Sequence, residues 1–363
     1  MKNTFGNNIA VTLFGESHGE AVGAVLDGVP AGIEVDYGAI ASALEKRRGE
    51  APLSTKRREA DEFKIISGVY NGKTTGTPLC ILIENTDTDS AAYEALAGKV
   101  RPGHADYTSL VKSSGFADVR GGGHLSGRLT APLVAVGEIC RAILLNKGIK
   151  IITHLAYCGG VNDRTFADFD ADCDSLLHNA FPVLDEKAAE QMKTAILSAA
   201  EKGDSIGGIT ETCVCGLPAG AGEPWFDSVE SLISHAMFSV PAVKGVEFGA
   251  GFKCADMHGS EMNDELYFES GIVKTAANNN GGINGGITNG MPVVFRCAVK
   301  PTPSVSVEQN TVDLKNNENT KIQVGGRHDP CIAPRACAVI DALTAITLCD
   351  LLAQKFGTDR LGE

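Results

Sequence analysis

Residues 9–26 read IAVTLFGESHGEAVGAVL, and in this stretch two short apolar runs flank a loop that glycine bounds on both sides. Residues 9–14 and 21–26 have the composition of β-strands, whereas residues 15–19 have that of a turn. Loops at strand ends carry chemistry more often than the strands themselves. The stretch therefore predicts two neighbouring strands that hold a candidate site, with His18 on the loop between them.

The rest of the chain alternates between helical and strand-like patterns with no steady β-α-β rhythm. The helical patterns cover residues 37–48, 129–146, 188–202, 228–239 and 335–355, and the strand-like ones cover residues 64–70, 78–84, 150–157, 209–217, 243–248 and 292–299. Irregular spacing of this kind favours antiparallel pairing and an α+β fold. Asn71-Gly72 is a hairpin signal, although the connection between the two runs that flank it is longer than two residues. No repeat, low-complexity tract or linker is visible, so we expect one compact domain over residues 1–363.

The composition is that of a soluble globular protein, with 43% hydrophobic and 21% charged residues. The first residues lack the pattern of an export signal, and charged residues or glycine interrupt the apolar stretches short of the roughly 18 residues that a membrane helix needs. Eleven cysteines are scattered singly along the chain, which is typical of reduced thiols rather than of a small disulfide framework. We therefore expect a cytoplasmic protein with no membrane span.

The net charge of -13 argues against a nucleic-acid partner, because no basic stripe dominates the chain. A local exception is the dense basic stretch formed by residues 46–48 and 56–58, which read KRR in both places. This local exception is informative because the protein is acidic overall.

Two histidines and one carboxylate lie in loops of small residues, where side chains are free to react. His18 lies in GESHG and His104 in RPGHAD, whereas Asp329 lies in GGRHDP just before the last predicted helix. A loop histidine can act as a general acid or base, and Asp329 can act as a base or help to cap the helix. A metal-assisted hydrolase is an alternative, although no metal-ligand spacing supports it; a serine hydrolase lacks its Gly-x-Ser-x-Gly frame.

Taken together, GESHG at 15–19, RPGHAD at 101–106, RGGG at 120–123 and GRHDP at 326–330 resemble the chorismate synthase family in identity and order. Residues 84–87 (ENTD), 203–207 (GDSIG), 242–247 (AVKGVE) and 300–304 (KPTPS) extend the resemblance over nearly the whole chain. The resemblance implies a β-α-β layered sandwich, with helices held between antiparallel sheets, assembled as a homotetramer.

The resemblance also implies a substrate and a reaction. The substrate would be 5-enolpyruvylshikimate-3-phosphate, from which a 1,4-elimination of phosphate gives chorismate in the shikimate pathway of aromatic amino acid biosynthesis. By similarity, the substrate-binding residues are Ser17, Arg47, Arg101, Ser126, Arg128 and Arg327. Arginine forks suit a ligand that carries two carboxylates and a phosphate.

The implied cofactor is reduced flavin mononucleotide, FMNH2, which lends electron density as phosphate leaves and is unchanged overall. By similarity, the cofactor-binding residues are His124, Leu125, Ser126, Ala242, Gly285, Lys300, Thr302, Pro303, Ser304 and Arg327. His18 would protonate the leaving phosphate, His104 would protonate or stabilise the flavin, and Asp329 would assist proton removal at the flavin. No metal is implied. An external flavin reductase is favoured as the source of reduced flavin, with reduction by the enzyme's own use of NADPH left open.

The sequence departs from the family's pattern at two places. Residues 123–128 read GHLSGR where the family commonly has GRSSAR, so a cation and a hydroxyl are replaced by His124 and Leu125. Residues 50–53 read EAPL where a further substrate-side arginine is usual, and Lys46 or Lys56 is a candidate substitute. A catalytically silent flavin- or phosphate-binding homologue is therefore the second functional class to test.

Overall fold

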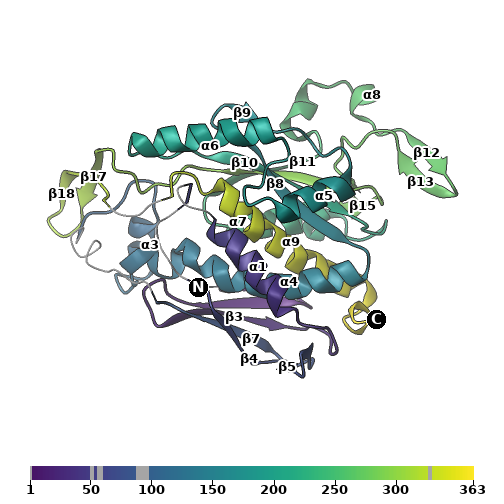
Figure 1. Cartoon of the computed structure of the whole chain (residues 1–363), viewed down its shortest axis with the longest axis horizontal. Helices are drawn as coiled ribbons and strands as arrows, with labels where there is room; N and C mark the ends of the chain where they lie inside the picture. Colours follow the sequence, from purple (N-terminus) through teal and green to yellow (C-terminus); the bar gives the residue numbers. More distant parts are fainter. Residues whose placement is uncertain (1, 50–52, 55–59, 87–97, 326–328) are drawn as a thin grey trace.

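The computed structural model describes residues 2–49, 53–54, 60–86, 98–325 and 329–363. In this part of the chain two five-stranded antiparallel sheets enclose a layer of helices, as Figure 1 shows. The predicted α+β class with antiparallel sheets, and the layered arrangement that the resemblance implies, are confirmed.

The first sheet carries the His18 loop. Its strand order is β1-β2-β3-β7-β4, with β1 at Thr4–Phe5, β2 at Ala10–Gly15, β3 at Ala21–Asp27, β4 at Phe63–Ser67 and β7 at Leu79–Glu84. Strands β2 and β3 pair up to Gly15 and Val22, so residues 16–20 close this hairpin. A Cβ on Gly15 would lie 2.3 Å from the Ala21 carbonyl oxygen, and the φ of 98° also requires glycine.

The second sheet has the order β11-β16-β10-β8-β9. Its strands are β8 at Lys150–Cys158, β9 at Val161–Asn162, β10 at Gly208–Cys215, β11 at Val243–Phe248 and β16 at Val293–Val299. Helix α6 (Glu186–Glu201) lies on the outer side of this sheet, and α5 (Phe169–His178) lies beside β8 (Figure 1).

Helices α1 (Tyr37–Arg48), α4 (Thr130–Asn146), α7 (Val229–Ser239) and α9 (Ala333–Phe356) fill the middle layer. Helix α4 packs on the first sheet and α9 on the second, and the two helices approach each other closely. A Cβ on Gly137 of α4 would lie 2.4 Å from the Cβ of Ala342, so this crossing requires glycine. Residues 127–146 and 333–356 are long and apolar enough to cross a membrane, but both are largely buried core helices.

The residues at its two ends explain where α1 begins and ends. The Asp36 carboxylate accepts a hydrogen bond from the Ala39 backbone N–H (2.9 Å), which caps the helix, and Gly49 ends it with a φ of 69°. Lys46, Arg47 and Arg48 occupy the last turn, where cations oppose the negative end of the helix dipole. The predicted helix over residues 37–48 is thus confirmed.

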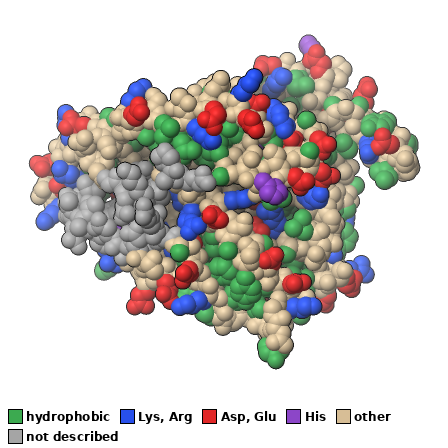
Figure 2. Space-filling view, in the orientation of Figure 1, with side chains coloured by type: hydrophobic (Ala, Val, Ile, Leu, Met, Phe, Trp, Pro, Cys, Tyr) green, Lys and Arg blue, Asp and Glu red, His purple; other side chains and the backbone are tan. Residues whose placement is uncertain are grey.

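The remaining elements are shorter. They are β5 (Val69–Tyr70), β6 (Lys73–Thr74), α3 (Asp106–Lys112), η1 (Arg120–Leu125), η2 (Gly127–Leu129), η3 (Trp225–Asp227), η4 (Gly251–Asp256), α8 (Gly259–Met262), β12 (Leu266–Glu269), β13 (Ile272–Thr275), β14 (Ile283–Asn284), β15 (Ile287–Thr288), β17 (Gln309–Asp313), β18 (Glu318–Ile322) and η5 (Asp359–Leu361). On the face drawn in Figure 2, acidic and basic side chains are interspersed.

One predicted strand is wrong. The run over residues 64–70 is broken at Gly68, where a φ of 85° and a hypothetical Cβ 2.4 Å from the Leu79 Cα forbid any other residue. Strand β4 therefore ends at Ser67, and Val69–Tyr70 pairs instead with Lys73–Thr74. Asn71 and Gly72 both have positive φ, so they form a two-residue hairpin turn rather than part of a longer connection.

Candidate active site

Two consecutive glycines, Gly121 and Gly122, lie between the two loop histidines in space. A Cβ on Gly121 would lie 2.5 Å from the His18 Nε2, and one on Gly122 would lie 3.6 Å from the His104 Nε2. Both glycines have positive φ, at 60° and 88°, inside the η1 segment. The structure therefore brings His18 and His104, predicted from separate motifs, to the two sides of one glycine loop.

Ser17 is held at the same place. It is fully buried, and its backbone N–H donates to the Gly123 carbonyl (3.1 Å). A Cβ on Gly121 would also lie 2.9 Å from the Ser17 Oγ. A hydrogen bond thus joins the hairpin loop to the glycine loop. Because residues 121 and 122 have no side chains, the glycine loop can approach both histidines closely.

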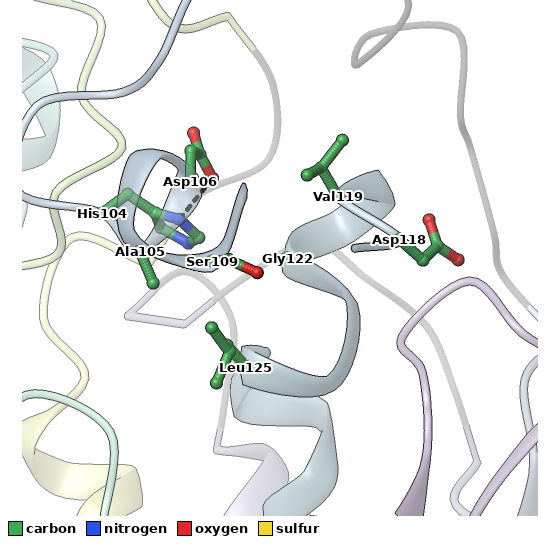
Figure 3. Close-up of a pocket in the computed structure, with 8 residues that line it drawn as sticks. All are labelled: His104, Ala105, Asp106, Ser109, Asp118, Val119, Gly122 and Leu125. Atoms are coloured by element: carbon green, nitrogen blue, oxygen red, sulfur yellow. Dashed lines mark ion pairs between the residues drawn. The ribbon is translucent and has the colours of Figure 1, made fainter. Parts of the chain in front are cut away.

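His104 is oriented by Asp106. The His104 Nδ1 lies 2.6 Å from the Asp106 Oδ1, and Figure 3 shows the carboxylate pointing at the imidazole. The same carboxylate accepts hydrogen bonds from Arg101 Nε (2.8 Å) and Nη2 (2.7 Å). Burial by itself raises the pKa of Asp106, but the contacts with Arg101 and His104 outweigh burial and hold that pKa well below its usual value. An ionised Asp106 favours the tautomer with the proton on His104 Nδ1, which leaves Nε2 to face Gly122.

A small cavity of about 10 Å³ opens beside His104, large enough for about one water molecule. Its walls come from α3, the segment before it and the glycine loop, as Figure 3 shows; the lining residues are His104, Ala105, Asp106, Ser109, Asp118, Val119, Gly122 and Leu125. The side chain of Leu125 borders this cavity, whereas that of His124 turns to the His18 hairpin, where its Nδ1 lies 2.8 Å from the Gly15 carbonyl oxygen.

Two predicted substrate arginines meet at one carboxylate. Arg47 Nη1 contacts Asp61 Oδ2 at 3.0 Å, and Arg128 Nη1 contacts Asp61 Oδ1. All three side chains are at most 5% exposed. Two guanidinium groups thus converge on one buried carboxylate, and guanidinium forks suit an anionic ligand. Ser126 supports the arrangement, since its Oγ accepts a hydrogen bond from the Arg128 N–H (3.3 Å).

Half of the predicted cofactor residues gather where β16 ends. The Lys300 N–H donates to the Ala242 carbonyl (2.9 Å), and Lys300 Nζ donates to the Gly103 carbonyl (2.6 Å), next to His104. A Cβ on Gly103 would lie 3.4 Å from Pro303. Arg101 Nη1 donates to the Ser304 Oγ (3.3 Å), which links this segment directly to the Asp106 carboxylate.

Gly285 lies apart from this group within the described chain. It is in the turn between β14 and β15, and the preceding Gly282 packs against Pro292 at the start of β16. Lys300 follows the other end of β16, and the extended chain from Pro292 to Lys300 spans about 26 Å at about 3.3 Å per residue. A single chain therefore does not bring Gly285 to Lys300. Arg327, predicted to contact both ligands, lies outside the described residues.

Asp329 connects the last helix to the end of α1. Its Oδ2 lies 2.5 Å from Arg335 Nη1, and its Oδ1 accepts a hydrogen bond from the Ser54 Oγ (2.9 Å). Arg335 Nε in turn donates to the carbonyl of Arg47 (2.8 Å). Helix α9 has Ile332 at its N-cap position, so Asp329 does not cap it.

Lys46 does not replace the missing arginine. Its Nζ lies 3.4 Å from the Leu176 carbonyl of α5, on the side of α1 that faces the second sheet. Arg47, the next residue, points to Asp61 because neighbouring helix positions differ by about 100°. Lys56, the other candidate substitute, lies outside the described residues.

Sequence reasoning missed three residues of the site. Asp106 and Asn85 lie inside the motifs RPGHAD and ENTD. The two motifs therefore marked these positions, although neither residue type alone indicated a role. Asp61 lies between Ala60 and Glu62 in an acidic stretch with no local feature, and only the fold brings it to Arg47 and Arg128. Among the described residues, no group of three or more His, Cys, Asp or Glu side chains is arranged to hold a metal ion.

Comparison with known proteins identifies one family. The family model for chorismate synthase matches residues 9–353. A chorismate synthase of Dehalococcoides mccartyi is 45% identical over 361 residues, covering 97% of this chain and 96% of the relative. A chorismate synthase of Thermococcus gammatolerans is 44% identical over 356 residues, covering 96% of this chain and 97% of the relative. A crystal structure of chorismate synthase superposes with a TM-score of 0.77 at 30% identity, covering 98% of this chain and 94% of that one.

The layered α+β fold and a site built from loop histidines and buried arginines define an enzyme that acts on a small molecule. The chain belongs to the chorismate synthase family. It is therefore a lyase of biosynthetic metabolism.

Proposed function

We propose that the chain converts 5-enolpyruvylshikimate-3-phosphate to chorismate by 1,4-elimination of phosphate and depends on reduced FMN that is unchanged overall. The observation that carries the proposal is the convergence of His18 and His104 on Gly121 and Gly122, beside the segment of residues 300–304. The reaction belongs to the shikimate pathway, and we place it in the cytoplasm.

The residues at the end of β16 fit a flavin with a phosphate tail. The Thr302 Oγ1 is buried and has no hydrogen-bond partner among the described residues, and Ser304 is buried beside it in sequence. An unsatisfied buried hydroxyl is costly unless a ligand completes it. Lys300, Thr302, Pro303 and Ser304, together with Ala242, would hold the cofactor, whose reduced ring supplies electron density for the elimination.

Each chain residue has a distinct task in this proposal. His18 would donate the proton that the leaving phosphate needs, because its ring lies against Gly121, on the other side of the glycine loop from His104. With its Nδ1 proton held by Asp106, His104 would take up a second proton at Nε2 and present it to the flavin. Asp329 would accept the proton released at the flavin, and Arg335 and Ser54 fix the orientation of its carboxylate.

The arginines divide into two groups. Arg47 and Arg128, with Ser17 and Ser126, would bind the anionic groups of the substrate. Arg101 would act at the boundary between substrate and cofactor, since it contacts Asp106 and Ser304. We assign Arg327 to both ligands by similarity alone. We also assign flavin contacts at His124 and Leu125, in the loop where this sequence departs from its family.

The assay that tests the function supplies reduced FMN under anaerobic conditions. We expect chorismate and inorganic phosphate to form in equal amounts with no net oxidation of the flavin. Turnover without flavin, or oxidation of one flavin per product, would contradict the mechanism. A rate that rises with added divalent metal would favour the hydrolase alternative, and tight flavin binding without turnover would identify a silent homologue. Adding NADPH in place of a flavin reductase tests our expectation that the reductase is external.

We further propose that the chain is one domain and assembles as a homotetramer. One cluster of buried hydrophobic residues runs from Ile9 to Leu361, which supports a single domain. The β12–β13 hairpin projects from the body in Figure 1, and Leu266 and Phe268 on it are 71% and 79% exposed. An isolated two-stranded hairpin with exposed apolar side chains is marginal in water, so a neighbouring subunit is the natural cover.

Light scattering after gel filtration tests the assembly. We expect a tetramer for the wild type and smaller species for Phe268→Asp, because the change places a charge in a subunit contact. Tyr70→Asp is the matched control, since Tyr70 is 73% exposed on another two-stranded hairpin, β5–β6. A monomeric wild type would refute the tetramer, and a tetrameric Phe268→Asp would refute the hairpin contact.

A further inference from the structure

Asn85 joins two parts of the site that come from different regions of the chain. It follows directly after β7, and its backbone N–H donates to the Glu20 carbonyl (3.0 Å). Its side-chain Nδ2 donates to the carbonyls of Glu16 (3.0 Å) and Gly19 (2.9 Å), which bracket Ser17 and His18. Three hydrogen bonds from one residue therefore hold the His18 loop against the end of β7.

The other end of the amide holds an arginine. Arg128 Nε donates to the Asn85 Oδ1 (2.9 Å), and Arg128 Nη2 donates to the Glu84 carbonyl (3.2 Å). The partners determine the orientation of the amide, because carbonyl oxygens only accept hydrogen bonds and a guanidinium only donates them. Among side chains of this length, only an amide can donate to the loop and accept from the arginine at once.

Beyond Arg128, the same chain of contacts reaches Arg47 through Asp61. Arg47 is held in turn by Thr130 Oγ1, which accepts from its Nε (2.8 Å), and by the Gly127 carbonyl, which accepts from its Nη2 (3.2 Å). The arginine pair is thus fixed to α4, while the His18 loop belongs to the first sheet. Among the described residues, Asn85 is the side chain that hydrogen-bonds both to the His18 loop and to Arg128 of the arginine pair.

We propose that Asn85 is a positioning residue that sets the distance between His18 and the arginine pair. The proposal rests on the proposed function, in which the pair holds the substrate and His18 protonates its leaving phosphate. His18 can reach the leaving phosphate only if the arginine pair holds the substrate at the right distance from it. A displacement of about 1 Å can cost about 100-fold in rate.

Asn85→Asp tests the coupling. The carboxylate still accepts from Arg128, but both donors to the loop are lost and negative oxygen faces the carbonyls of Glu16 and Gly19. We expect kcat to fall about 10- to 100-fold with KM for 5-enolpyruvylshikimate-3-phosphate changed less than about threefold. Amide hydrogen exchange in residues 16–20 should become faster in the variant, which requires no assay of activity.

Asn179→Asp is the matched control, because it makes the same change at an exposed amide whose Nδ2 contacts Ser175 at the end of α5. We expect its kcat and its exchange in residues 16–20 to equal those of the wild type. An Asn85→Asp enzyme with kcat within twofold of wild type, or with unchanged exchange in residues 16–20, would overturn the proposal. A rise in KM with unchanged kcat would overturn it too, since that result assigns Asn85 to substrate binding through Arg128 alone.

If Asn85→Asp does not fold, Asn85→Ala carries the same comparison, with the same two results expected. Failure of the proposed function is recognised separately, because the wild type then makes no chorismate although the exchange difference between wild type and variant persists.

Discussion

Replacing Asp329 with asparagine is expected to slow turnover at least about 100-fold, because loss of a general base costs about 10²- to 10⁴-fold. Asparagine keeps the shape of the side chain but not its basicity. The variant should fold and bind substrate and reduced flavin together. Its melting temperature should fall, since the contact between Asp329 Oδ2 and Arg335 loses one of its two charges.

Arg335→Gln is the matched control for this experiment. It breaks the same ion pair but leaves the Asp329 carboxylate and its hydrogen bond from Ser54 in place. Arg335→Gln also loses the hydrogen bond from Arg335 Nε to the Arg47 carbonyl and one of the two contacts that orient Asp329, so we expect it to lose stability in thermal melts and some of its single-turnover rate. Asp329→Asn is expected to lose far more of that rate, because only this variant lacks the base. Near-normal turnover in Asp329→Asn with a lowered melting temperature would remove Asp329 from the catalytic residues and leave it a structural role.

Gly121→Ala is expected to lower kcat about 100-fold by moving His18. The added Cβ would lie 2.4 Å from His18 Cδ2 and 2.9 Å from the Ser17 Oγ, and neither contact is compatible with the present position of the ring. The backbone φ of 60° also disfavours any residue with a Cβ, which costs about 1–2 kcal/mol of stability. Activity and stability therefore both fall, and a control must separate them.

Gly115→Ala provides that control. Gly115 has a φ of 88°, but a Cβ there would meet no atom within 4 Å. The two variants should therefore lose comparable stability in denaturant unfolding, whereas only Gly121→Ala should lose activity. Equal activity in both would mean that the His18 ring adapts without loss and that the close approach at Gly121 has no catalytic consequence.

Local features of this protein were predictable from residues that lie within one short segment. The helix over residues 37–48 was predictable because Asp36 and Gly49 cap it and its last turn is basic, all within one short segment. The antiparallel character of the sheets followed from irregular strand spacing. His18 and His104 were recognisable because small-residue motifs of fixed order surround them, and family membership required nothing further.

Contacts between residues far apart in sequence were not predictable in the same way. Lys46 and Arg47 are equivalent cations in sequence, but the turn of the helix directs one to α5 and the other to Asp61. Asp61 has no local signal of function, and the ENTD motif around Asn85 does not show which groups the amide holds, because the partners of both residues lie on segments distant in sequence. Gly285 was grouped with Lys300 by similarity, yet β16 separates them. Local sequence order fixes caps, turns and periodicity, whereas contacts between distant segments depend on how the sheets and helices pack.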